Sequence, residues 1–288
     1  MEYGAHLPLL DLGAPPTLRS LRAYAETAAA SGYRVLCAND HILFSRPWLD
    51  GPTALAAVID ESGDMTLATS VALLVVRGPA PLAKSIGALD VLSGGRALAG
   101  VGPGSSARDY AAAGVPFEER WRRFDRALPA LRELLHGDEL QPRPIQRPGP
   151  PIWVASWGSP AGLRRVARHG DGWLASAYNI TPERFREAAA ALPAMPNGLA
   201  TAWLCVTEDA AGADRVLADV LSPMVGRPVE ELRSRSLPIG PAEVCAERMR
   251  AFADAGVQRI FLWPLRDEAR QLELFMERVA PLVGRPAA

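Results

Sequence analysis

The chain has 288 residues, with 31 lysines and arginines against 32 aspartates and glutamates, and so a formal net charge of -1. Nucleic-acid-binding proteins usually carry a basic excess, so we expect no nucleic-acid partner. The composition, 49% hydrophobic and 22% charged, is typical of a folded globular protein and excludes a largely disordered one.

No apolar run approaches the roughly 20 residues that a membrane-spanning helix needs, and the N-terminus shows no secretory signal. We therefore expect a cytoplasmic protein with no membrane partner. The cysteines, Cys37, Cys205 and Cys245, are odd in number and widely spaced, which fits neither a disulfide framework nor a thiolate metal site. We expect all of them to be buried.

In the first half of the chain, short β-like runs alternate with amphipathic helical stretches. The predicted strands are residues 3–7, 34–38, 65–71 and 96–101. The predicted helices are residues 17–31, 79–92 and 118–135. Glycines follow two of these helices, at Gly32 and Gly94, where a helix commonly stops.

A proline-rich linker, residues 141–151, precedes the second half, in which the alternation resumes. The predicted strands there are residues 152–155, 172–176, 199–206 and 259–263. The predicted helices are residues 159–169, 181–192, 209–221, 241–255 and 268–282. An irregular segment is expected before the last strand.

Eight strands interleaved with helices predict an α/β protein built as one TIM-type (β/α)8 barrel over residues 1–288. A doubly wound open sheet is the competing fold. The linker leaves four strands on either side, and neither half is complete alone, so we predict a single domain. Catalytic residues of such barrels lie at the C-terminal ends of the strands.

Two histidines lie near the C-terminal ends of predicted strands. His41 comes after the second strand with Asp40 beside it, and an adjacent carboxylate can orient an imidazole and bias its charge. We therefore predict His41 as a general acid or base and Asp40 as its partner. His6 lies near the end of the first strand and is a weaker candidate.

Glycines and serines follow the fourth and fifth strands. Gly100, Gly102 and Gly104 let the backbone approach a flat or phosphorylated ligand, although a tight turn explains them equally well. A dinucleotide fingerprint would need a third glycine where Ser105 stands. Ser156 and Ser159 precede a helix whose free N–H groups could bind an anion, but an ordinary helix cap is the simpler interpretation.

Aromatic residues gather beside the predicted strand-to-helix loops, which favours a partly apolar pocket above the barrel. They are Phe44, Trp48, Trp157, Tyr178 and Trp263. Other tryptophans, Trp153, Trp173 and Trp203, lie within predicted strands and are expected to pack in the core.

Four blocks of sequence together resemble the luciferase-like family of flavin- and deazaflavin F420-dependent oxidoreductases. They are TSVALLVVRGPAPLAKSIGALDVLSGGRALAGVGPG (69–104), GVPFEERWRRFD (114–125), PIWVASWGSPAGLRRVARHGDGW (151–173) and IGPAEVCAERMRAFADAGVQRIFL (239–262). The resemblance covers most of the chain, and the order of the blocks makes it specific.

The resemblance implies a barrel with an insertion after the fourth strand and a flavin or deazaflavin ring across the strand ends. Ser70-Val71 matches the family's bulge behind the ring, commonly a non-prolyl cis peptide bond, and Asp40-His41 matches its Asp-His pair. Residues 157–159 match a phosphate-binding Gly-Gly turn, with Trp157 in place of the first glycine and Gly158 and Ser159 following.

The same resemblance restricts the class of substrate that we expect. Sugar-phosphate dehydrogenases of the family carry a glutamate where Ser105 stands here, together with phosphate-binding lysines, whereas this chain has a single lysine, Lys84. We therefore do not expect glucose 6-phosphate as substrate. The predicted substrate pocket is formed by His6, Phe44, Trp48, Ser105, Tyr178 and Trp263.

The predicted function is hydride transfer between an F420-type deazaflavin and a small, partly apolar organic substrate. The nearest alternative is a monooxygenase that uses reduced FMN and oxygen. A metal-dependent hydrolase built on His6, Asp40 and His41 is disfavoured because so few histidines are present, and we predict no metal site. A non-catalytic flavin-binding barrel is the remaining alternative. By analogy with the family we expect a homodimer.

Overall fold

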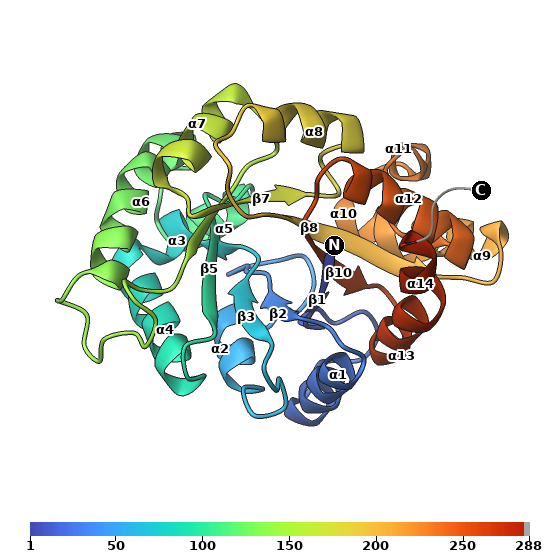
Figure 1. Cartoon of the computed structure of the whole chain (residues 1–288), viewed down its shortest axis with the longest axis horizontal. Helices are drawn as coiled ribbons and strands as arrows, with labels where there is room; N and C mark the ends of the chain where they lie inside the picture. Colours follow the sequence, from blue (N-terminus) through green and yellow to red (C-terminus); the bar gives the residue numbers. More distant parts are fainter. Residues whose placement is uncertain (285–288) are drawn as a thin grey trace.

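The computed structural model describes residues 1–284 of the chain. Within these residues the barrel strands are β1 (Glu2–His6), β2 (Val35–Ala38), β3 (Thr66–Thr69), β5 (Ala97–Gly102), β6 (Ile152–Ala155), β7 (Gly172–Ser176), β8 (Asn197–Val206) and β10 (Arg259–Pro264). Each pairs in parallel with the next, and β10 pairs with both β8 and β1, which closes the ring (Figure 1). The predicted eight-stranded barrel is confirmed.

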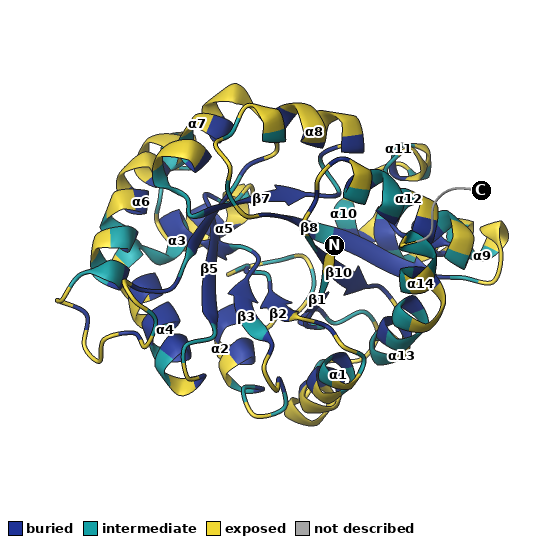
Figure 2. Cartoon of the chain, in the orientation of Figure 1, coloured by how far each residue is buried: buried dark blue, intermediate teal, exposed yellow. Residues whose placement is uncertain are grey.

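The strands carry apolar residues on both faces, because one face points into the packed barrel interior and the other is covered by helices. β2 and β5 are buried at every position, and the surrounding helices turn exposed faces outward and buried faces toward the sheet (Figure 2). Such strands read as continuous hydrophobic runs rather than as alternating patterns. Side chains from seven strands fill the barrel interior: Val35, Cys37, Ala68, Leu98, Trp153, Leu174, Ala200 and Phe261.

The longer helices surround the barrel. They are α1 (Leu18–Ala30), α4 (Pro79–Leu92), α6 (Arg120–His136), α7 (Pro160–His169), α8 (Pro182–Ala190), α12 (Ala242–Asp254) and α13 (Glu268–Leu274). Polar side chains cap three of them: Thr17 accepts from the Ser20 amide, Ser159 from Gly162 and Thr181 from Arg184. These caps satisfy amides that have no partner within the helix.

Short elements lie between them, and most were not predicted. They are α2 (Gly51–Ala56), α3 (Leu74–Arg77), α5 (Ala107–Ala112), α9 (Ala210–Val216), α10 (Ser222–Val225), α11 (Val229–Arg233), α14 (Ala280–Val283), the 3-10 turn Phe117–Glu119, the π segments Leu217–Leu221 and Phe275–Val279, β4 (Ala72–Leu73) and β9 (Ile239–Gly240). A single helical turn is too short to show hydrophobic periodicity.

Two of these elements change the predicted chain path. The predicted strand 65–71 ends at Thr69, the Ser70-Val71 peptide bond is cis, and β4 then resumes pairing with β5. The segment expected to be irregular before the last strand holds α10 and α11 and ends in β9, which pairs with the end of β8. The predicted insertion after β5 contains α5, the 3-10 turn and α6.

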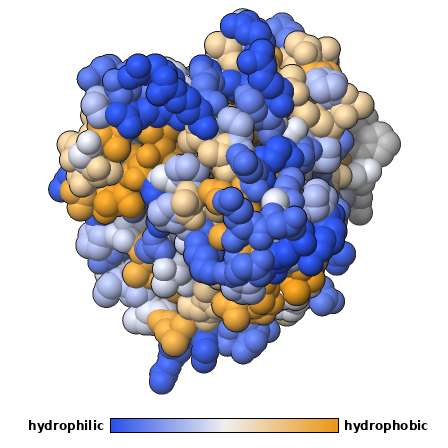
Figure 3. Space-filling view, turned by 90° about the vertical axis from the view of Figure 1, so that its left-hand side faces the viewer, coloured by the Kyte–Doolittle hydropathy of each residue, from blue (hydrophilic) through white to orange (hydrophobic). Residues whose placement is uncertain are grey.

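The surface on the α4 and α6 side of the molecule mixes hydrophilic areas with separate hydrophobic patches (Figure 3). The three cysteines are free and buried, as predicted. None of the helices within residues 1–284 is both long and apolar enough to cross a membrane.

Candidate active site

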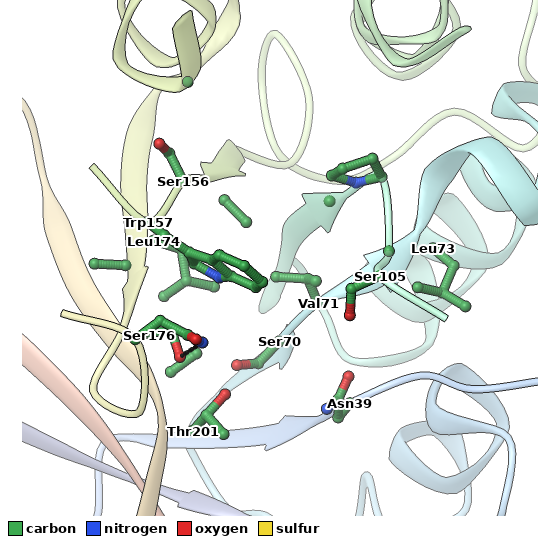
Figure 4. A pocket seen from close by; sticks show the side chains of 18 of the residues that line it. Asn39, Ser70, Val71, Leu73, Ser105, Ser156, Trp157, Leu174, Ser176 and Thr201 are labelled. Carbon is green, nitrogen blue, oxygen red and sulfur yellow. Dashed lines mark hydrogen bonds between the residues drawn. The ribbon is translucent and has the colours of Figure 1, made fainter. Parts of the chain in front are cut away.

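A cavity of about 460 Å³ opens at the C-terminal ends of the strands, the end where barrel enzymes place their catalytic residues. Its size is that of a typical small-molecule site. Polar side chains from the ends of β2, β3 and β7 and from the middle of β8 point into it in the close-up of Figure 4: Asn39, Ser70, Ser176 and Thr201. Predicted residues in its lining are Asp40, His41, Ser70, Val71, Gly102, Gly104, Ser105, Ser156, Trp157 and Ser159.

His41 is held by Asp109, a residue that the sequence does not predict for the site. The Nδ1 atom of His41 lies 2.7 Å from Oδ2 of Asp109, and Oδ1 accepts from the amides of Ile42 at 2.9 Å and Leu43 at 2.8 Å. The Asp109 side chain is 1% exposed. A carboxylate can only accept here, so Nδ1 carries the proton that it shares with Asp109 and leaves Nε2 free.

The prediction that Asp40 orients His41 is wrong. Asp40 is 1% exposed and accepts two hydrogen bonds of 2.6 Å from Arg77 and one of 3.0 Å from the Leu73 amide. The hydrogen bonds to Asp40 raise the pKa of Arg77. Arg77 also bonds Asp50, the N-cap of α2. Asp40 therefore connects the loop after β2 to the segment after β3. Its neighbour in the sequence, His41, pairs with Asp109 instead.

The cis Ser70-Val71 bond forms the floor of the cavity. A cis bond at this position agrees with the family resemblance of Ser70-Val71. Ser70 is 2% exposed, and its hydroxyl has no hydrogen-bond partner although it lies in the cavity lining. Gly102 sits beside this floor, because a Cβ there would approach Val71 Cγ2 to 2.9 Å. Ser70 is thus free to bond a ligand.

Gly100 does not line the cavity. A Cβ at this position would lie 2.0 Å from the Thr69 carbonyl oxygen, and the Thr69 hydroxyl donates to the Gly100 carbonyl at 2.7 Å. Position 100 therefore requires a glycine, because β3 and β5 approach each other too closely there to leave room for a Cβ. Gly104, which lines the cavity, has a φ of 83°, a conformation that favours glycine.

The turn after β6 is held by its own serines. Ser156 Oγ accepts from the Gly158 amide at 3.2 Å, and Ser159 Oγ accepts from Gly162 at 3.1 Å. Gly158 has a φ of 83° and does not line the cavity. Trp157 is 57% exposed and forms part of the cavity wall.

Two arginines at the cavity were not predicted. Arg120 lies over the Phe117 ring at 4.0 Å, and Arg165 lies over Trp121 at 4.8 Å. Both line the cavity from the helical layer, in α6 and α7. Arg165 also forms an ion pair with Asp125. Because arginine is frequent throughout the chain, nothing in the composition distinguished Arg120 and Arg165 from the other arginines.

The remaining predicted pocket residues do not line the cavity. His6 stacks on Trp263 with ring centroids 3.6 Å apart, and Trp263 also contacts Trp203 at 4.0 Å and Trp48 at 5.7 Å. We call these four residues the aromatic plug. Trp48 contacts His41 at 4.7 Å, so the plug adjoins the cavity wall.

Phe44 and Tyr178 do not line the cavity. Phe44 contacts both His41 and Trp48, at 4.7 and 4.8 Å. Tyr178 follows β7 and lies under Arg235 at 5.4 Å. Among residues 1–284 no group of three or more His, Cys, Asp or Glu side chains is placed to hold a metal ion.

Comparison with known proteins agrees with this arrangement. Residues 5–259 match the model of the family described as luciferase-like monooxygenase. This chain belongs to that family. The predicted luciferase-like family is therefore confirmed.

Relatives within the luciferase-like family include the F420-dependent hydroxymycolic acid dehydrogenase of Mycobacterium tuberculosis. It is 30% identical over 193 residues, which cover 59% of this chain and 52% of the relative. The chain thus spans about half the length of this curated relative.

Solved structures of similar luciferase-like proteins share the fold along the whole chain. One is an F420-dependent secondary alcohol dehydrogenase in complex with an F420-acetone adduct, with a TM-score of 0.80, 17% identity and 99% coverage of both chains. Another is the oxygenating constituent of 3,6-diketocamphane monooxygenase of Pseudomonas putida in complex with FMN, with a TM-score of 0.72, 18% identity and 100% coverage of both chains.

Proposed function

We propose that this protein is an oxidoreductase that transfers a hydride between an F420-type deazaflavin and a small, partly apolar organic substrate. The observation that carries the proposal is the imidazole of His41, held by a buried carboxylate at the wall of a cavity above the barrel. When bound, the deazaflavin supplies or accepts the hydride. The protein has to orient both molecules, exclude water and provide a proton.

The residues in the cavity fit such a cofactor. The hydroxyl of Ser70 is buried without a partner and would hydrogen-bond the ring system. Val71 and Leu174 provide apolar contact on the same side, and both are in the cavity lining. The turn at Ser159 and the cations Arg120 and Arg165 would hold the anionic tail.

His41 would carry the proton. Because its Nδ1 proton is shared with Asp109, Nε2 is the atom that can accept a proton from an alcohol or donate one to a carbonyl. Asp109 stabilises the imidazolium while His41 is protonated, and it also keeps the ring from rotating. The same arrangement serves either direction of the reaction.

Two observations favour F420 over FMN. Two guanidinium groups line the cavity, and the tail of F420 carries several negative charges where FMN carries one phosphate. A relative that the chain matches at 30% identity is named as F420-dependent. The rival, an FMN-dependent monooxygenase, is supported by the similar fold of an FMN-bound monooxygenase.

The deciding experiment compares the two cofactors on the purified protein. We expect quenching of F420 fluorescence on titration, with weaker binding of FMN, and F420 reduction by members of a panel of secondary alcohols. His41→Gln should retain F420 binding and lose turnover by about a hundredfold or more. FMN binding tighter than F420 binding, with oxygen consumed in the presence of reduced FMN, would overturn the proposal in favour of the monooxygenase.

Cofactor binding with no oxidation or reduction of any alcohol, carbonyl or alkene in such panels would instead support the non-catalytic alternative. We also propose a single-domain, cytoplasmic homodimer, by analogy with the family. Size-exclusion chromatography with light scattering measures the oligomeric state directly, and a monomeric mass would refute the dimer.

A further inference from the structure

At the level of the cavity, β8 contains one residue more than its neighbour β10. The register pairs Leu199 with Ile260 and Ala202 with Leu262, so β8 advances from 199 to 202 while β10 advances only from 260 to 262. A β-bulge of this kind interrupts the alternation of side chains along a strand and re-aims one of them. The inserted residue lies between Leu199 and Ala202.

The bulge directs two successive side chains toward the inside of the barrel. Ala200 belongs to the cluster that fills the barrel interior, and Thr201, the next residue, lines the cavity. Leu199 and Ala202 on either side belong to the other core cluster. Figure 4 shows the Thr201 side chain pointing into the cavity. The bulge thus adds a hydroxyl to the barrel mouth that a regular strand would not supply.

Thr201 has a strained backbone. Its φ is 55°, a left-handed conformation that is rare for a β-branched residue and easy for glycine. Conformations of this kind cluster at ligand sites, where the surrounding structure holds them in place. A glycine at position 201 would relieve the strain but would carry no hydroxyl. The strain therefore points to a role for the threonine side chain in the cavity.

The adjacent strand, β7, contributes further uncharged hydrogen-bonding groups. Ser176 pairs with Ala200 across β7 and β8, so it stands beside Thr201. Its Oγ accepts from the side-chain amide of Asn179 at 3.0 Å and can still donate its own proton. Within residues 1–284, the lining contributed by β7, β8 and the loop after β7 carries no charge. It consists of Leu174, Ala175, Ser176, Asn179, Ala200 and Thr201.

The positive charges of the cavity lie in another part of its lining. Arg120 and Arg165 reach it from α6 and α7, the helices before and after β6. β8 is opposite β3 in the closed ring, since β5, β6 and β7 separate them on one side and β2, β1 and β10 on the other. Thr201 therefore lies across the barrel mouth from Ser70. The cavity suits a ligand with an uncharged polar end and an anionic end.

We propose that Thr201 and Ser176 hydrogen-bond the uncharged polar edge of the ring of the redox cofactor. This edge, the pyrimidinedione, has a carbonyl oxygen on either side of an N–H group, and flavins and deazaflavins share it. Hydroxyl groups suit it because each can both donate and accept. The inference rests on the proposed function and deepens it by assigning an orientation, with the ring edge toward β7 and β8 and the anionic tail toward Arg120 and Arg165.

The test compares riboflavin with 3-methylriboflavin, two uncharged probes that carry the ring without a phosphate. Methylation removes the N–H and adds bulk at the edge, so fluorescence quenching should show weaker binding of the methylated probe to the wild type. Thr201→Val keeps the branched shape and removes the hydroxyl, and it should raise the Kd for riboflavin about fivefold. Thr201→Ser should recover most of the affinity.

Thr27→Val is the matched control, because Thr27 lies in α1 outside the cavity lining and its Kd for riboflavin should equal that of the wild type. Equal affinity of the wild type for both probes, or an unchanged Kd in Thr201→Val, would overturn the inference.

Thermal stability separates a ligand-binding role from a structural one. Thr201→Gly relieves the strained φ, so its Tm should equal or exceed that of the wild type while its Kd for riboflavin rises as in Thr201→Val. A lower Tm with an unchanged Kd would show that Thr201 serves the fold and would overturn the inference.

The proposed function can fail separately from this inference. F420 and FMN share the same ring edge, so tighter binding of FMN would refute the assignment of F420 and leave the test of Thr201 intact. Thr201→Val should then raise the Kd for FMN by the same factor as for riboflavin. Failure of the wild type to bind F420, FMN and riboflavin would overturn both.

Discussion

Asp109 and His41 are 68 residues apart in sequence, and their side chains meet at 2.7 Å beside the cavity. Asp109 belongs to α5, in the insertion after β5, and His41 belongs to the loop after β2. The same carboxylate accepts from the amides of Ile42 and Leu43, so it shapes the loop as well as the ring. One buried carboxylate thus connects the insertion to the proposed acid-base residue.

Replacing this carboxylate by an amide tests its role. In Asp109→Asn the amide nitrogen would face Nδ1 of His41 or displace the ring, so we expect kcat to fall by about a hundredfold. Steady-state kinetics measures this loss.

The matched control is Asp214→Asn, since Asp214 is an exposed carboxylate paired with Arg233 on the surface. Its kinetics should equal those of the wild type. A kcat in Asp109→Asn equal to that of the wild type would contradict a role for this carboxylate in holding His41.

His6 predicts a pH-dependent stability. Its pKa is about 3 in the folded protein because burial disfavours the charged ring, against about 6.5 in an unfolded chain. The unfolded state therefore binds more protons between these values, and stability that is fully present above pH 6.5 is lost as pH falls toward 3. The loss is about 1.4 kcal/mol per pH unit at most. Burial raises the pKa of its titratable neighbours Tyr24 and Cys37, so neither titrates in this window.

The measurement is urea unfolding of the wild type and His6→Phe between pH 7 and 5. The variant should lose less stability on acidification than the wild type by roughly this slope. His169→Gln is the control, because its ring is only partly buried, and it should keep most of the wild-type dependence. Parallel curves for wild type and His6→Phe would show that His6 is not buried in its neutral form.

Arg77 is expected to hold the loops around the cavity together. Arg77→Leu would leave the carboxylate of Asp40 buried without its charged partner, which commonly costs about 3–5 kcal/mol. Chemical denaturation should show this loss of unfolding free energy. Arg259→Leu, which removes a surface pair with Glu2, should cost about 1 kcal/mol or less. Similar losses in both variants would contradict the importance of the Asp40 pair.

Gly100 should be required for folding and not for cofactor binding. In Gly100→Ala the new Cβ would meet the Thr69 carbonyl oxygen at 2.0 Å, and two barrel strands would have to separate. We expect a loss of several kcal/mol or insoluble protein. Gly284→Ala, which meets nothing within 4 Å, is the control and should be neutral. A stable Gly100→Ala protein with weakened F420 binding would restore the cofactor role predicted for this glycine.

Arg120 should contribute to F420 affinity through its charge. Arg120→Gln is expected to raise the Kd for F420 several-fold and to reduce its dependence on salt concentration, because a screened charge interaction is removed. Fluorescence titration at two ionic strengths measures both quantities. Arg278→Gln is a control outside the cavity lining. An unchanged Kd in Arg120→Gln would place the tail of the cofactor elsewhere.

The barrel could be predicted from the sequence alone because its signals are local. Apolar strand runs such as 172–176, helical periodicity such as that of 17–31, and helix-stopping glycines repeat along the chain, and each depends on residues close together in sequence. Parallel strands then require helical crossovers, so the order of elements determines the fold. The positions of His41 and Ser70 at strand ends followed from the same order.

Only the tertiary structure decided which side chains pair at the strand ends. Adjacency in sequence suggested that Asp40 serves His41, but the loop conformation turns Asp40 to Arg77 and brings Asp109 to the imidazole. Likewise His6 and Trp263, from the first and last barrel strands, meet only because the ring closes. Contacts between distant segments depend on loop geometry and on barrel closure, and local periodicity carries no information about either.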